Sequence, residues 1–163
     1  MEKVKKPKKT KKLWKSILGW VVYLAILAGL VFGVPRGLAY VLKTDYPMAS
    51  ITSGSMWPSL KKGDLVVIKG ITNKNEINLN DIIVYKNNPS TSSGRFAGFT
   101  IHRVIELRED TLITKGDANN INDAPIGYGE VIGKTINFKG KIVKIPKIGY
   151  ISLLINPNKA NAQ

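Results

Sequence analysis

The chain opens with a lysine-rich segment, continues with a long apolar stretch, and then changes to short apolar runs. Residues 16–34 contain no charged side chain over 19 positions. A helix of that length is about 28 Å long, close to the hydrocarbon thickness of a bilayer. A secretory signal has an apolar stretch of about 7–15 residues followed by a small-residue cleavage site, and the best site here, at 37–39, is poor. The pattern predicts an uncleaved transmembrane anchor with its exit segment over residues 16–42.

Beyond residue 43 the apolar positions form short, β-branched runs separated by Gly, Asn, Asp and Pro. The runs cover residues 65–68, 81–85, 99–107, 111–114, 130–133 and 135–145. Runs of this length and punctuation are typical of antiparallel strands, and no amphipathic helix is evident after residue 45. We therefore expect a mainly β fold, in which one N-terminal transmembrane helix precedes an antiparallel β domain over 43–155. A flexible excursion is predicted at 87–98 and a flexible C-terminal tail at 156–163.

The charge of the chain is concentrated at its start. There are 25 Lys and Arg against 11 Asp and Glu, a net charge of +14, and residues 1–15 alone contribute +7. Positive residues beside a transmembrane segment are retained in the cytoplasm. We therefore expect residues 1–15 to form a basic cytoplasmic tail, and the β domain to lie outside the cytoplasm at the cell membrane. A nucleic-acid-binding arm is the alternative, but the apolar stretch that follows directly favours the anchor, so no nucleic-acid partner is expected.

The composition limits the chemistry that this chain performs. It has no Cys and one His, which excludes disulfides and thiol nucleophiles and makes a His-based metal site improbable. We expect no metal and no cofactor. Any catalysis must come from Ser, Lys, Asp and the single histidine, His102.

Three short segments combine reactive side chains with turns or strand ends. They are SGSMWP at 53–58, IHRV at 101–104 and KGDANNIND at 115–123. Taken singly, each has a structural interpretation: a turn serine, a partly buried histidine and an Asx-rich turn. On a strand, His102 would lie on the face opposite Ile101 and Arg103.

Taken together and in this order, the segments resemble type I signal peptidases. With GDLV at 63–66 they match four motifs of the archaeal and endoplasmic-reticulum branch, and the resemblance spans roughly residues 14–155. It implies a β catalytic domain in which Ser55 is the nucleophile and His102 the general base, at the position where the commoner bacterial branch has Lys. It also implies an oxyanion hole formed by the Ser55 backbone N–H and the Ser53 side chain. The alternative that Ser53 only forms the turn stays open.

The resemblance implies that an aspartate of the third segment serves His102, and two are available. Asp117 follows strand residues directly, where a carboxylate commonly accepts hydrogen bonds from Arg or Lys and orders a loop. Asp123 lies deeper in the loop and matches the third catalytic position of the His-using branch. We assign Asp123 to His102 and Asp117 to support of the site, and the reverse assignment stays open.

The implied substrates are signal peptides of exported preproteins, cut after small-x-small sites. The lipid bilayer is an expected partner, with Trp57 either at its interface or packed in the core. Gly29 and Gly33 leave room for a membrane partner helix. The alternative function is a non-catalytic, membrane-anchored β domain that acts as a binding or assembly subunit.

Overall fold

The computed structural model of the chain describes residues 9–87 and 98–151, with side chains described from residue 14 onward. Contacts divide the chain into two compact units, Met1–Leu38 and Ala39–Gln163. Each unit is described by itself. The predicted excursion at 87–98 lies outside the described residues except for its two ends, and the predicted tail at 156–163 lies wholly outside them.

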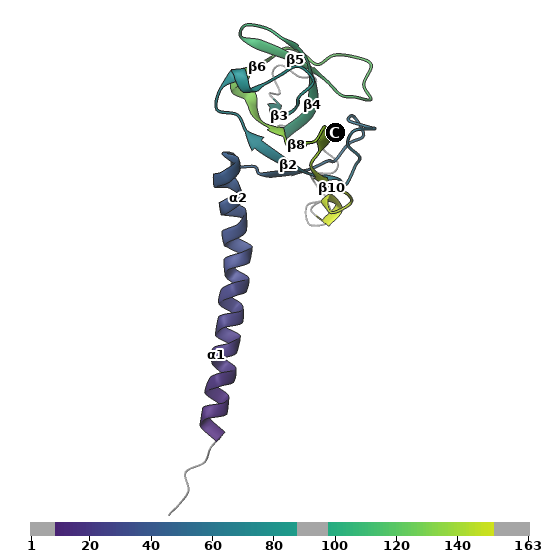
Figure 1. The fold of residues 1–163 in the computed structure, drawn as a ribbon. Coiled ribbons are helices and arrows are strands. Elements are labelled where there is room, and N and C mark those ends of the chain that lie inside the picture. Colours follow the sequence, from purple (N-terminus) through teal and green to yellow (C-terminus); the bar gives the residue numbers. More distant parts are fainter. Residues whose placement is uncertain (1–8, 88–97, 152–163) are drawn as a thin grey trace, which may run out of the picture. The chain divides into compact units, whose positions relative to one another are not determined.

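The N-terminal part is helical from Lys9 to Leu42 (Figure 1). Helix α1 spans Lys9–Ala28, a π-helical turn spans Gly29–Gly33, and α2 spans Val34–Leu42. Pro35 has no N–H to donate to the carbonyl four residues back, and its ring crowds that carbonyl, which fits the wider turn just before it. Trp14–Leu42 is long and apolar enough to cross a membrane. The sequence-based prediction of one N-terminal membrane-capable helix is therefore confirmed.

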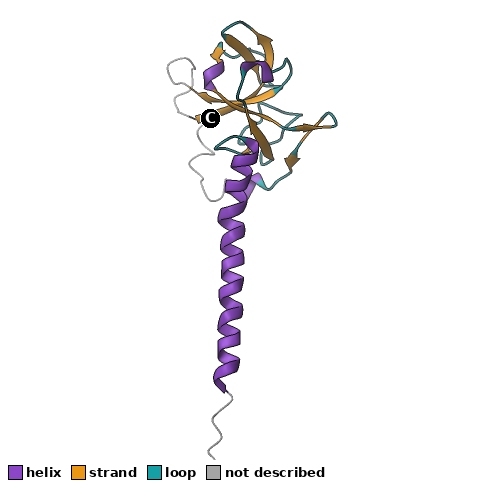
Figure 2. Ribbon diagram, turned by 60° about the vertical axis from the view of Figure 1, so that its left-hand side comes forward, coloured by secondary structure: helices purple, strands orange, loops and turns teal. Residues whose placement is uncertain are grey.

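The second unit is built from short antiparallel strands (Figure 2). Seven of them form one sheet in the order β1-β2-β7-β3-β4-β5-β6, β10 also pairs with β2, and β8 pairs with β9. The strands are β1 (Met48–Ser50), β2 (Leu65–Gly70), β3 (Ile82–Asn87), β4 (Gly98–Leu107), β5 (Thr111–Lys115), β6 (Ile126–Gly127), β7 (Val131–Thr135), β8 (Asn137–Phe138), β9 (Lys141–Ile142) and β10 (Lys144–Ile145). Two 3-10 turns, Lys74–Glu76 and Tyr128–Glu130, connect them. The mainly β expectation is confirmed.

The long run expected at 135–145 is broken into several pieces. β7 ends at Thr135, a separate two-stranded hairpin follows, and β10 returns to the main sheet. The cause lies at Lys139 and Gly140, which have φ values of 49° and 76°. Two successive residues with positive φ make the tight turn of a two-residue hairpin, so the apolar run folds back on itself.

Apolar side chains pack on both faces of the central strand β3. Ile82 and Val84 belong to one core cluster, whereas Ile83 and Tyr85 belong to a second cluster with Val104. A strand buried on both faces reads as a continuous apolar run, which is the pattern of residues 82–85. His102 is paired with Ile83, so its side chain lies on the face of the second cluster.

Candidate active site

Ser55 lies in the loop between β1 and β2, and the loop is held at several points. Met56, the next residue, is 1% exposed in the first core cluster. The Ser55 carbonyl accepts a hydrogen bond of 2.8 Å from the Ala118 backbone N–H. That approach requires a glycine at position 116, because a Cβ there would lie 2.7 Å from the Ser55 carbonyl oxygen. The loop of Ser55 and the Asx-rich loop after β5 are therefore joined at one fixed point.

His102 connects the two loops through its ring. It is 7% exposed on β4, on the face opposite Ile101 and Arg103, as its alternation in the strand predicts. Its Nε2 is 3.1 Å from Ser55 Oγ, and its Nδ1 is 2.6 Å from Asp123 Oδ2. A carboxylate accepts only, so Nδ1 carries a proton, and when the ring holds no second proton Nε2 is the acceptor for the Ser55 hydroxyl.

Asp123 is held against His102 by further hydrogen bonds. Its backbone N–H donates to the Thr114 carbonyl at 2.8 Å, and its carboxylate accepts from the hydroxyls of Thr114 and Tyr85. Burial raises the pKa of the Asp123 carboxyl, but the donors outweigh it, His102 first, so that the pKa lies below its ordinary value. Asp123 is therefore an ionised carboxylate beside the imidazole.

Asp117 has a different partner. The guanidinium of Arg103 donates to both of its carboxylate oxygens, at 2.8 Å from Nε and 2.7 Å from one terminal nitrogen. The same nitrogen donates to Ser59 Oγ at 3.1 Å. Desolvation raises the pKa of Asp117, but Arg103 and Ser59 outweigh it and lower the pKa. The arrangement ties the Asx-rich loop to β4 and to the loop of Ser55.

Ser53 lies beside Ser55. Its Oγ is 3.1 Å from Ser55 Oγ and accepts a long hydrogen bond of 3.4 Å from the Ser55 backbone N–H. A bond of that length is weak. The two groups expected to form an oxyanion hole are thus neighbours, and both lie next to the reactive hydroxyl.

Trp57 and Met56 differ sharply in exposure. Trp57 is 59% exposed, whereas Met56 is buried. This excludes the interpretation of Trp57 as a core residue.

The sequence interpretation missed the groups that hold the two aspartates. Thr114 and Tyr85 contact Asp123, while Arg103 and Ser59 hold Asp117. The sequence signal that could have found Thr114 and Tyr85 is a hydroxyl-bearing residue at a strand position that is expected to be buried. Thr114 is fully buried, and Tyr85 ends an apolar run. Sequence spacing does not reveal which strands bring such residues together.

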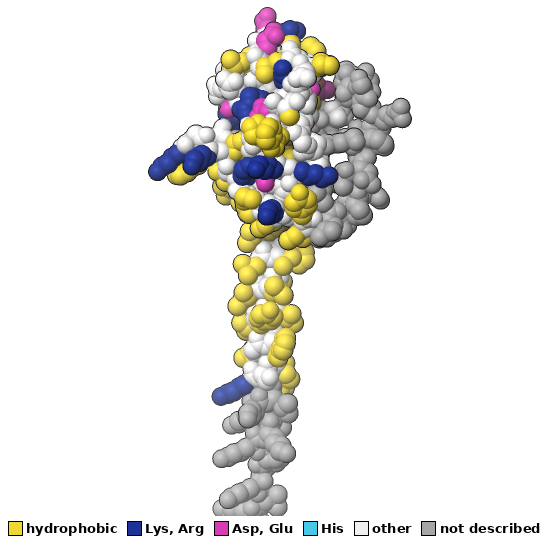
Figure 3. Space-filling view, turned by 90° about the vertical axis from the view of Figure 1, so that its right-hand side faces the viewer, with side chains coloured by type: hydrophobic (Ala, Val, Ile, Leu, Met, Phe, Trp, Pro, Cys, Tyr) yellow, Lys and Arg dark blue, Asp and Glu magenta, His cyan; other side chains and the backbone are white. Residues whose placement is uncertain are grey.

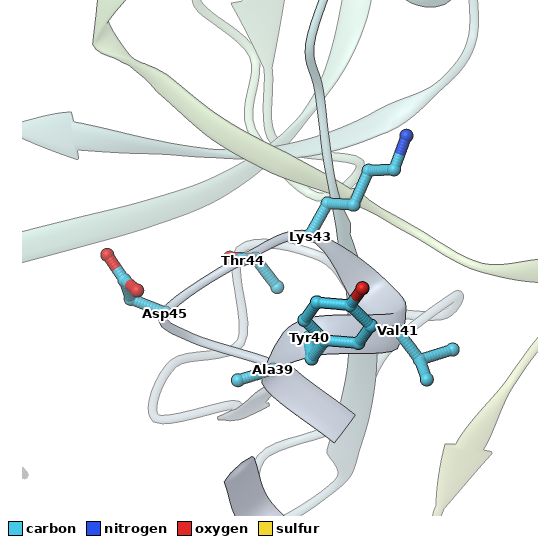
Figure 4. A pocket seen from close by; sticks show the side chains of 6 residues that line it. All are labelled: Ala39, Tyr40, Val41, Lys43, Thr44 and Asp45. Carbon is cyan, nitrogen blue, oxygen red and sulfur yellow. The ribbon is translucent and has the colours of Figure 1, made fainter. Parts of the chain in front are cut away.

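The described part of the second unit also has a surface cavity of about 680 Å³ at the end of α2 (Figure 4). Its lining residues are Ala39, Tyr40, Val41, Lys43, Thr44 and Asp45. The side chains of Lys43 and Asp45 diverge from each other rather than pointing toward a common centre. The cavity includes none of the residues around Ser55.

Across the described residues, no group of three or more His, Cys, Asp or Glu side chains is placed to hold a metal ion.

A hydroxyl, an imidazole and a carboxylate in hydrogen-bond order are the arrangement of serine hydrolases, in which the imidazole activates the hydroxyl for acyl transfer. No family model matches the chain. Curated relatives do. The chain is 31% identical over 135 residues to the signal peptidase complex catalytic subunit SEC11 of Lachancea thermotolerans, covering 76% of this chain and 74% of the relative.

Other relatives of the same name match over similar lengths. The SEC11 subunit of Scheffersomyces stipitis is 28% identical over 144 residues, covering 83% of this chain and 81% of its own. That of Ogataea parapolymorpha is 25% identical over 159 residues, covering 86% and 85%. The chain belongs to this signal peptidase family and is a serine-type endopeptidase. The alternative of a non-catalytic binding subunit is thereby set aside.

Proposed function

We propose that this chain is a membrane-anchored endopeptidase that removes signal peptides from exported preproteins after small-x-small sites. Ser55 is the nucleophile, His102 the general base and Asp123 the carboxylate that orients His102. The observation that carries the proposal is the ordered contact from Ser55 Oγ to His102 at 3.1 Å and from His102 to Asp123 at 2.6 Å. The names of the relatives support the substrate class.

In the acylation step, Ser55 Oγ attacks the carbonyl carbon of the scissile peptide bond while its proton passes to His102 Nε2. The tetrahedral intermediate collapses as His102 returns that proton to the leaving amine. The mature protein then departs, and the signal peptide remains as an ester of Ser55. Asp123 keeps its negative charge throughout and stabilises the imidazolium while it exists.

In the deacylation step, a water molecule attacks the ester carbonyl and gives its proton to His102 Nε2. His102 then protonates Ser55 Oγ as the carboxylate product leaves. In both steps the negative charge on the carbonyl oxygen is stabilised by the Ser55 N–H and the Ser53 hydroxyl. The hydrogen bond between these two groups is weak, at 3.4 Å, and this supports the role. An oxyanion that accepts from both groups would break only that weak bond.

Asp117 supports the site without touching the reacting atoms. Its two hydrogen bonds with Arg103 fix the loop that also carries Ala118, whose N–H holds the Ser55 carbonyl. In this proposal Asp117 acts on catalysis through the position of the nucleophile loop.

The helix places the enzyme at its substrate. We assign residues 1–15 to the cytoplasm, residues 16–42 to the membrane and residues 43–155 to the extracytoplasmic side, because lysines beside a span are retained inside. The described helix surface supports an anchor, since the face in Figure 3 is mostly apolar. Exposed Trp57 beside the nucleophile is suited to the membrane interface, where Trp is enriched.

The relatives are subunits of a complex, which supports protein partners for this chain. Gly29 and Gly33 are the proposed contact for a partner helix. An added Cβ at Gly29 or at Gly33 meets no other part of the described structure within 4 Å, so the helix surface is open at both positions.

The test is cleavage of a preprotein by the full-length chain in detergent micelles, with the new N-terminus read by mass spectrometry. We expect cleavage after a small-x-small site by the wild type and none by Ser55→Ala. Thr72→Ala is a matched control that removes another hydroxyl, on an exposed residue that donates a hydrogen bond to Glu76 outside the candidate site, and it should cleave as the wild type does. Equal cleavage by wild type and Ser55→Ala would refute the assignment.

A further inference from the structure

Two buried hydroxyls contact the Asp123 carboxylate in addition to His102. Thr114, on β5, is fully buried, and Tyr85, on β3, is 4% exposed. Thr114 Oγ1 is 2.6 Å and the Tyr85 hydroxyl 3.3 Å from Asp123 Oδ2. The two hydroxyls are themselves 3.3 Å apart. Oδ2, the oxygen that contacts His102, therefore lies in a cluster of three donors.

The number of protons fixes the direction of these hydrogen bonds. Thr114 has one hydroxyl proton, and its contact with the carboxylate is much shorter than its contact with Tyr85, so it donates to Asp123. Tyr85 also donates its one proton to Asp123. Both hydroxyls thus direct their protons at the oxygen that faces His102.

Burial, followed by the nearby Asp123 charge, raises the pKa of Tyr85 to about 12. The phenol consequently remains a donor over the whole range in which a peptidase of this kind is assayed. Thr114 in addition accepts the Asp123 backbone N–H through its carbonyl. One residue of β5 therefore fixes both the backbone and the side chain of Asp123.

We propose that Thr114 and Tyr85 are positioning residues that hold the Asp123 carboxylate on His102 Nδ1, with Thr114 contributing the larger part. Held in this way, Asp123 keeps the proton on Nδ1 and leaves Nε2 as the acceptor for Ser55. The inference rests on the proposed roles of Ser55, His102 and Asp123. Asp117 is a further charged group near His102, and its carboxylate is paired with Arg103.

His102 is the only histidine in the sequence, which makes its tautomer directly measurable. Nitrogen-15 labelling of histidine in the full-length protein, in micelles and with a tag that lacks histidine, gives one pair of ring signals whose shifts distinguish Nδ1–H from Nε2–H. The variants are Thr114→Val, Thr114→Ser and Tyr85→Phe. Thr135→Val is the matched control, because Thr135 is a strand residue, 4% exposed, whose hydroxyl has no hydrogen-bond partner in the described structure.

We expect the wild type and Thr135→Val to show the Nδ1–H tautomer and equal kcat. Thr114→Val should show a mixture of tautomers and lose about tenfold in kcat, with KM within about twofold. Thr114→Ser should recover most of that loss because it restores the donor. Tyr85→Phe should change both readouts in the same direction by a smaller amount, about threefold in kcat.

Unchanged tautomer and kcat in Thr114→Val would overturn the inference. So would an equal loss in Thr114→Val and Thr114→Ser, because the restored hydroxyl would then have no effect, or an equal loss in Thr135→Val. If Thr114→Val does not fold, Tyr85→Phe decides alone, and a wild-type tautomer with wild-type kcat in that variant refutes the proposal. Failure of the proposed function is a separate result, seen as undiminished cleavage by Ser55→Ala.

Discussion

Asp117 and Asp123 lie in one loop, six residues apart, and their partners differ in kind. Asp117 binds a guanidinium that is charged at every pH of interest, through two hydrogen bonds. Asp123 binds an imidazole through one of its oxygens, at 2.6 Å from Nδ1. The two partners, Arg103 and His102, are successive residues of β4, so the alternation of the strand sends one to each face.

The difference shows what makes a carboxylate available for catalysis. The charge of Asp117 is already compensated by Arg103, so little of it remains to stabilise another cation. The carboxylate of Asp123 contacts an imidazole and two hydroxyls, those of His102, Thr114 and Tyr85, and no guanidinium among the described residues. In the proposed mechanism the charge of Asp123 is therefore available to stabilise the imidazolium when His102 takes the Ser55 proton. The same side-chain type thus fixes a loop at Asp117 and, in the proposed mechanism, supports proton transfer at Asp123.

The largest expected effect comes from replacing the base. His102→Lys places an ammonium against Asp123 and should reduce kcat on the order of 10⁴-fold or more, because a lysine base requires a pKa lowered by several units and the neighbouring carboxylate favours the charged form. Initial-rate cleavage of a preprotein measures it. Activity within tenfold of wild type would contradict the assignment of Asp123 as the partner of the base.

Removing the charge of Asp123 tests the comparison directly. Asp123→Asn should keep the fold and lose about 10²–10⁴ in kcat, because the amide can hold the wrong tautomer of His102. Circular dichroism and kcat measure the two parts. If Asp123→Asn stays active while Asp117→Asn is folded but inactive, then Asp117 orients His102 and Asp123 supports the site.

Asp117→Asn should affect stability and activity together. It leaves the partly buried guanidinium of Arg103 without its carboxylate, and we expect the Tm to fall by about 5–10 °C. We expect kcat to fall by about tenfold through the loop that holds Ser55. Asp110→Asn, at an exposed turn residue, is the control. A wild-type Tm in Asp117→Asn would show that its ion pair with Arg103 does not stabilise the loop.

The smallest expected effect is the acid dependence of stability. The pKa values of Asp117 and Asp123 both lie below the ordinary 3.8 in the folded protein. Their contributions are therefore complete above that value and are lost as the pH falls below it. The Tm difference between wild type and Asp117→Asn should be larger at pH 7 than at pH 3. Equal differences at the two pH values would contradict this linkage.

Local patterns were sufficient to predict the membrane-capable helix, most of the strands and the face of β4 on which His102 lies. The contact of Asp123 with His102 agrees with the position implied by the family resemblance. The other partners of the two aspartates were not predictable, because they come from β3, β4, β5 and the loop of Ser55, which only the tertiary fold brings together. The break after Thr135 was missed because two turn residues, Lys139 and Gly140, outweigh the apolar pattern around them.

The π-helical turn at Gly29–Gly33 has a geometric consequence for the helix surface. Ala25, Gly29, Gly33 and Gly37 recur every fourth residue. Four residues of an α-helix overshoot a full turn by about 40°, so such a series would spiral steadily around the axis. A π turn takes more residues to complete, so the step from Gly29 to Gly33 falls short and reverses part of that rotation. The four small residues consequently lie in a straighter line, and a helix packed along it would meet small side chains over three successive steps.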